Sequence, residues 1–116
     1  MSARIHVRAN QLIATDVTVS DSYVTERVDM QLMEGVAFQV NWKDGTDIVG
    51  ELSVECSVDG VTYCTFVGSS TSISGITGGQ IFDIVETHVR YIRIKIDGFS
   101  GSSIFNVRMN LRTREM

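Results

Sequence analysis

The amino-acid sequence predicts an all-β protein, an antiparallel two-sheet β-sandwich of the jelly-roll type with about eight strands. Apolar and polar residues alternate with a period of two in several segments, whereas helical spacing of apolar residues is nowhere sustained. Glycine beside aspartate or serine separates these segments, as expected of turns between strands. The chain has 116 residues, enough to bury a core, so residues 1–116 are expected to form one domain.

The segment 51–66 predicts a β-hairpin. Its first part alternates apolar with polar residues, the pattern of a strand with one buried face, which is expected to carry Leu52, Val54, Cys56 and Val58. Asp59 and Gly60 then predict a tight turn, because glycine readily adopts a positive φ and aspartate tolerates it. Residues 61–66, rich in β-branched and aromatic side chains, are expected to form the return strand.

The segment 36–43 is the clearest single strand, and its alternation places Trp42 on the core face beside Phe38 and Val40. Further strands are expected at residues 4–14, 17–19, 23–25, 27–33, 81–85 and 87–97, and in a last strand with Phe105, Val107, Met109 and Leu111 facing inward.

Two segments rich in glycine and serine are expected to be loops. Residues 68–79 are long enough to form a functional loop or a crossover between two sheets. Residues 98–102 should connect the last two strands. Residues 113–116, at the terminus, are expected to be loose.

Charge and composition exclude some classes of partner. The net charge is −4, which argues against nucleic acid because nucleic-acid binding usually requires a concentrated basic surface. Arg108, Arg112 and Arg114 share a parity, and an exposed strand face explains them better than a nucleic-acid site. No apolar run is long enough for a membrane span and residues 1–12 do not resemble a secretory signal, so assembly inside a cell is expected.

The chain contains no proline, the residue that often protects the edge strands of β-proteins. Its edges are therefore expected to be protected by charge or covered by another subunit. The second alternative predicts a homo-oligomer.

Cys56 and Cys64 flank the predicted turn and would face each other across the hairpin if the loop has a suitable length. A cross-strand disulfide and two buried free thiols both fit this placement. A reducing cytosol favours the free thiols.

No group of residues predicts a catalytic, cofactor or metal site. His6 and His88 have no neighbouring nucleophile or carboxylate pair at the spacing of a catalytic site. Asp44, Asp47 and Asp59 could offer oxygen ligands to calcium, but turn geometry alone explains aspartate beside glycine. The protein is therefore expected not to be an enzyme and to hold no cofactor.

Tyr91 and Phe99 are the aromatic residues most expected to be exposed, since Tyr91 alternates away from its isoleucine neighbours and Phe99 follows a glycine. Together they could stack on a sugar ring or anchor a subunit interface, with Arg108 and Arg112 as further contacts.

The hairpin SVDGVTY, the later strand HVRYIRIKIDG and the final strand NVRMNLRTRE resemble the second half of discoidin-like, or galactose-binding-like, jelly-roll domains. In these domains a Ser-x-Asp-Gly strand end precedes an aromatic residue, here Ser57, Asp59, Gly60 and Tyr63. The preceding strand VAFQVNWKDG makes the chain more similar to small β-sandwich proteins of tailed-phage particles, which act in capsid decoration or in the tail.

This resemblance implies a non-enzymatic structural or accessory subunit of a virion, assembled in the host cytoplasm. Its partners would be capsid or tail subunits, which it would bind as an oligomer. The alternative is a carbohydrate-binding module that uses loops at one end of the sandwich, including Phe99 and residues 68–79.

Overall fold

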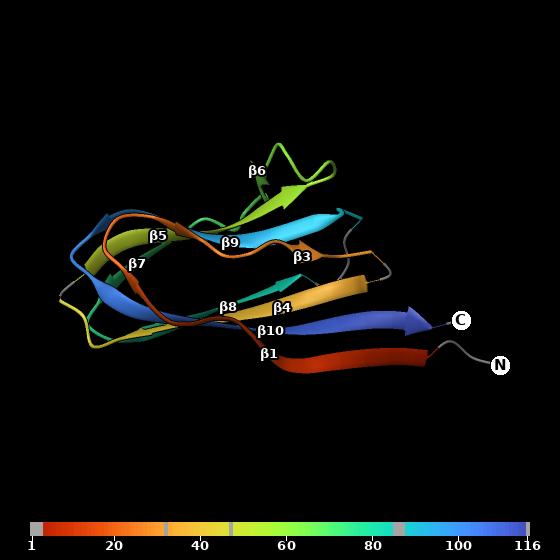
Figure 1. Ribbon diagram of the computed structural model, residues 1–116, viewed down its shortest axis with the longest axis horizontal. Coiled ribbons are helices and arrows are strands. Elements are labelled where there is room, and N and C mark those ends of the chain that lie inside the picture. Colours follow the sequence, from red (N-terminus) through yellow and green to blue (C-terminus); the bar gives the residue numbers. More distant parts are fainter. Residues whose placement is uncertain (1–3, 32, 47, 85–87, 116) are drawn as a thin grey trace.

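The computed structural model describes residues 4–31, 33–46, 48–84 and 88–115, with side chains for residues 11–97 within these ranges and for 100–112. The protein is a sandwich of two antiparallel sheets, and the all-β prediction is confirmed (Figure 1). The ten strands are β1 (Arg4–Val19), β2 (Tyr23–Val24), β3 (Val28–Asp29), β4 (Met33–Lys43), β5 (Ile48–Ser57), β6 (Cys64–Thr65), β7 (Thr71–Gly75), β8 (Gly78–Ile84), β9 (Tyr91–Ser100) and β10 (Ser103–Glu115).

The first sheet has the strand order β1-β10-β4-β8. The second sheet is built on the pair β9-β5: the short strands β2 and β3 lie on the free side of β9, and β6 and β7 lie on the free side of β5. The described residues contain no helix that could cross a membrane. The strand order of the two sheets confirms the predicted antiparallel two-sheet architecture, whereas the jelly-roll type stays a prediction.

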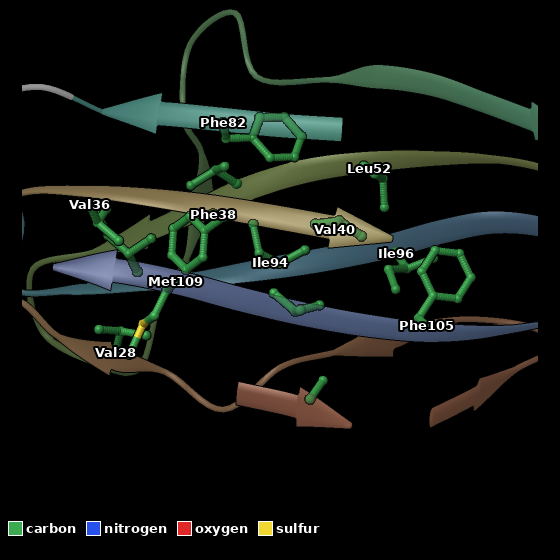
Figure 2. Packing of buried hydrophobic residues seen from close by; sticks show 14 of the residues in the cluster. Val28, Val36, Phe38, Val40, Leu52, Phe82, Ile94, Ile96, Phe105 and Met109 are labelled. Carbon is green, nitrogen blue, oxygen red and sulfur yellow. The ribbon is translucent and has the colours of Figure 1, made fainter. Parts of the chain in front are cut away.

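Alternating side chains from both sheets fill the core (Figure 2). Phe38 and Val40 of β4 and Phe105 of β10 are fully buried, and Ile94 of β9 and Leu52 of β5 meet them from the other sheet. Trp42 is buried with its ring centre 5.9 Å from that of Phe105, as the alternation of residues 36–43 predicts. Each of these strands can be recognised in the sequence because only one of its faces enters the core.

Strand β5 departs from this simple pattern, because both faces of its second half, residues 52–57, are covered. Ser53, Glu55 and Ser57, on the face opposite to Leu52 and Val54, are also buried. The loop that follows β5 and the charged side chains of β9 cover this second face, through contacts of Asp59 with Ser57 and of Arg93 and Lys95 with Glu55. The candidate site lies at this end of β5.

Two buried hydroxyls accept hydrogen bonds from amides of β5 and β9 at positions between the short flanking strands. The Ile94 amide donates a hydrogen bond to Thr25 Oγ1 beyond the end of β2, over 3.0 Å. The Val54 amide donates to Ser69 Oγ between β6 and β7, also over 3.0 Å. The flanking strands are too short to offer these two amides a backbone carbonyl. The hydroxyls of Thr25 and Ser69 accept their hydrogen bonds instead, so the amides of Ile94 and Val54 are satisfied.

Several expected boundaries are wrong. Residues 4–19 form one strand, not two, because bulges absorb the irregular part of the pattern; Asp16 lies there with a φ of +47°. Residues 68–79 contain β7 and the start of β8, so the predicted crossover between sheets is confined to the short link between these strands. Residues 98–100 belong to β9, and β10 extends to Glu115 by pairing with β1.

Candidate functional site

The candidate site is the end of the second sheet where the chain leaves β5. The expected tight hairpin is wrong: residues 58–63 form a loop, and the return strand is only β6. Asp59 Oδ1 accepts hydrogen bonds of 2.9 Å from the amides of Val61 and Thr62 and from the hydroxyl of Ser57. The aspartate therefore closes the loop on itself, and Gly60 follows with a φ of +78°.

These three hydrogen bonds stabilise the charged carboxylate. The pKa of Asp59 is lowered to about 2, first by the Val61 and Thr62 amides and then by the Ser57 hydroxyl. The interpretation of Asp59 as a turn residue is thus supported by its geometry. Among the described residues no group of three or more His, Cys, Asp or Glu side chains could hold a metal ion. Asp47, one of the calcium candidates, lies outside the described residues.

The loop lies against an Arg–Tyr cluster on the outer face of the second sheet, formed by Arg27, Tyr63, Arg90, Tyr91 and Arg93. The guanidinium carbons of Arg27 and Arg90 lie 4.3 Å and 5.2 Å from the centre of the Tyr91 ring. That of Arg93 lies 3.7 Å from the centre of the Tyr63 ring. Arg27 also donates to the Gly60 carbonyl over 3.2 Å, which holds the loop onto the sheet.

Two carboxylates, of Glu55 and Asp29, form ion pairs with arginines of the cluster. Glu55 is buried, and its carboxylate accepts a hydrogen bond of 2.8 Å from Arg93 Nε and lies 3.8 Å from Lys95 Nζ. The Asp29 carboxylate accepts two hydrogen bonds from Arg90, which lower the pKa of Asp29. Arg90 and Arg93 are therefore held in place on the outer face by these pairs.

The same loop borders a groove of about 720 Å³, called here the core-edge groove, beside Cys56, Phe66 and Val89, which are partly buried and pack against the hydrophobic core. The groove is lined by Cys56, Ser57, Val58, Asp59, Thr62, Cys64, Thr65, Phe66, Val67 and Val89.

Two valines that line this groove are strongly exposed, Val58 (77%) and Val67 (93%), and Val61 (82%) is exposed in the loop between them. These three valines are called here the valine rim. Figure 1 shows this part of the chain, around β6, standing off from the body of the sandwich. The inward position predicted for Val58 is wrong, because β5 ends at Ser57 and the next residue enters the loop. An exposed group of apolar side chains beside a groove is typical of a surface that binds another molecule.

Both cysteines line the core-edge groove as free thiols, as predicted. They lie directly opposite each other in the register of β5 and β6. Cys56 is half-buried but Cys64 is exposed, so the expectation that both thiols are buried is wrong for Cys64.

The residues predicted to contact a partner do not converge. Tyr91 begins β9 and is half-buried beneath its arginines; Phe99 lies eight residues further along β9, about 26 Å away at the rise of a strand, and its side chain is outside the described part. The two residues therefore cannot share one sugar ring, and sugar binding stays a prediction.

The arginines that share a parity near the C-terminus, Arg108, Arg112 and Arg114, do not form a continuous exposed stripe, because Arg112 lies beside Glu34. Arg108 is exposed on β10, whereas Arg112 is half-buried with its Nε 3.6 Å from Glu34 Oε2. The side chains of Arg114 and His6 lie outside the described part, and His88 is exposed. A role of Arg108 and Arg112 in an interface stays a prediction.

No protein-family model matches the chain, and no curated protein matches it. Solved structures share its fold. The SPBc2 prophage-derived protein YomS is similar at a TM-score of 0.55 and 11% identity, over 97% of this chain and 96% of YomS.

Two viral structures contain the same fold within longer chains. A chain from infectious bursal disease virus, Gt strain, is similar at a TM-score of 0.54 and 11% identity, over 97% of this chain but only 32% of the viral chain. A chain from the T13 viral particle of the same virus gives a TM-score of 0.53 and 12% identity, over 97% and 36%. At these identities the similarity concerns the fold, so the discoidin-like subtype stays a prediction.

Sequence reasoning named Tyr91 as a candidate contact and Tyr63 only as part of a family motif. It missed the three arginines of the Arg–Tyr cluster and the valine rim. The outward parity of Arg93 beside the isoleucines of β9 was an available signal. The position of Val61 had none, because it depends on how the hydrogen bonds of Asp59 fold the loop.

Proposed function

We propose that the protein is a non-enzymatic structural or accessory subunit of a virion, acting in capsid decoration or in the tail, and that it binds a protein lattice as an oligomer. The observation that carries this proposal is the shared fold: it spans nearly the whole length of a prophage-derived protein and recurs in chains of virus particles. Assembly in the host cytoplasm and incorporation into the particle follow from this role.

The valine rim is the proposed contact surface with the capsid or tail subunit. Its side chains are apolar and exposed, and two of them line the core-edge groove, so a partner's apolar side chains can bury them. The adjacent Arg–Tyr cluster offers aromatic and arginine side chains, which are enriched in the energetically important parts of interfaces.

Repetition of the lattice reduces the affinity that each contact must supply. A single contact of this small size would be weak, but identical copies held on one particle bind with a high effective concentration. The proposal therefore needs no large interface on a single subunit.

Co-sedimentation with particles tests this proposal. Particles released from cells that produce this chain are purified on a density gradient, and the chain is quantified by mass spectrometry in the particle band. The double variant Val58→Asp, Val67→Asp should lose most of its particle-bound fraction, because two charges would be desolvated at the contact.

The matched control is Val49→Asp, which places a charge at an exposed valine of β5 outside the core-edge groove. It should bind particles as the unmodified chain does. Absence of the unmodified chain from the particle band would refute the structural role. Equal binding by all variants would refute the valine rim as the contact.

A further inference from the structure

The two cysteines occupy a position that two independent features of the fold define. The register of β5 and β6 sets Cys56 directly opposite Cys64, so both side chains project from the same side of the hairpin. The core-edge groove exposes both of them to molecules in solution.

Backbone hydrogen bonding gives the separation of the two residues. The Phe66 amide donates to the Val54 carbonyl over 2.7 Å, and hydrogen-bonded pairs alternate along an antiparallel ladder. The pair Cys56–Cys64, two residues along each strand, is therefore of the hydrogen-bonded type, with Cα atoms about 5.5 Å apart. Disulfides span Cα separations of about 4.4–6.8 Å, so the Cα separation of this pair is within range. Their Cβ atoms, about 5.5 Å apart in a hydrogen-bonded pair, must approach to about 4.5 Å, so the bridge requires the short strand β6 to shift toward β5 by about 1 Å.

We propose that Cys56 and Cys64 form a reversible dithiol–disulfide site that reacts with small disulfides such as glutathione disulfide. In the first step the Cys64 thiolate attacks one sulfur of glutathione disulfide, forms a mixed disulfide and releases one glutathione thiolate. In the second step the Cys56 thiolate attacks Cys64 Sγ, the internal S–S bond forms and the second glutathione thiolate leaves. The two protein thiols are oxidised by two electrons, and one glutathione disulfide is reduced to two glutathione molecules, which take up the two thiol protons.

The surroundings set the order of these steps. Cys64 is exposed and is the thiol that a solute reaches first. Burial, and then the neighbouring Cys64 and Glu55, raise the pKa of Cys56 to about 11, which keeps Cys56 protonated and slow as a first nucleophile. Once Cys64 carries glutathione, Cys56 is already opposite the sulfur that it must attack.

The bridge would change the flexibility of the candidate contact surface. Residues 58–63 and the valine rim are tied to the sheet by the two-residue strand β6, and a covalent link at Cys64 would fix that strand to β5. An exposed disulfide of this kind is also readily reduced, which makes the link reversible.

Oxidation of the purified, folded full-length chain tests the site. The chain is incubated with excess glutathione disulfide in mildly alkaline buffer, quenched with acid and measured as intact protein and as peptides. The expected product is a monomer lighter by two hydrogen atoms, with a peptide pair that joins Cys56 to Cys64, and excess dithiothreitol should restore the dithiol. Cys56→Ser should instead stop at a mixed disulfide on Cys64.

A second readout uses the unmodified sequence alone and does not depend on whether variants fold. Chymotrypsin cleavage after Tyr63 and Phe66 should be several-fold slower in the bridged chain and should recover after reduction. Unreacted chain, a persistent mixed disulfide on Cys64, or a disulfide between two chains would each overturn the proposal.

Discussion

At the scale of single residues, Asp59 determines the form of the candidate site. Its carboxylate accepts the Ser57 hydroxyl and two loop amides, and the loop presents Val61 to solvent as a result. An Asp-Gly pair can turn a hairpin in two residues or cap a wider loop, and the sequence is the same in both cases. The residue types predicted a turn, but its width depends on contacts with Arg27 and Tyr91, which are distant in the sequence.

The lowered pKa of Asp59 predicts a pH-dependent stability. Its folded-state pKa is about 2 against an ordinary value of 3.8, so the stabilisation is fully present above 3.8 and is lost as the pH falls through 2. Asp59→Asn keeps an acceptor oxygen but cannot titrate. The variant should be less stable than the unmodified chain near neutral pH, and this difference should shrink as the pH falls toward 2.

Urea unfolding of both chains at a series of pH values measures this difference. Asp59→Ala, which lacks the acceptor as well as the charge, serves as the control and should be less stable than Asp59→Asn throughout. A gap between the unmodified chain and Asp59→Asn that stays constant across the acid range would contradict the assigned hydrogen bonds.

At the scale of strands, success of the sequence-based prediction depended on how many faces of a strand are buried. β4, β9 and the core part of β10 each bury alternate side chains, as Val40, Ile94 and Val107 illustrate, and their pattern predicted them. β7 was missed because its serines and threonine pair with β5 at an edge, where few side chains enter the core. The length of β1 was missed because bulges shift its register.

Phe38 tests the packing of the two sheets. It is fully buried, lies beside Met109 of the neighbouring strand β10 and meets β9 side chains across the sandwich, so Phe38→Ala should lower the free energy of unfolding by about 3–5 kcal/mol through lost burial and a residual cavity. Val49→Ala, at a valine that is 59% exposed, should change it by less than about 0.5 kcal/mol. Denaturant unfolding monitored through Trp42 gives both values, and equal losses would contradict the packing described here.

At the scale of the whole molecule, the proposed role in an assembly rests on two features. The sandwich has the fold of a prophage-derived protein and of parts of virus-particle chains, and the end of its second sheet exposes three valines beside the Arg–Tyr cluster. The sequence alone predicted the first feature through strand alternation and resemblance. It could not predict the second, because residues from β5, β9 and the segment around Arg27 meet only in the folded chain.

Electron microscopy of purified particles tests the structural role most directly. The proposal predicts that particles from cells producing this chain carry regularly repeated density that fits the two-sheet sandwich, with the valine rim turned toward a capsid or tail subunit. Particles complete in all other respects but without such density, and without peptides of this chain, would contradict it.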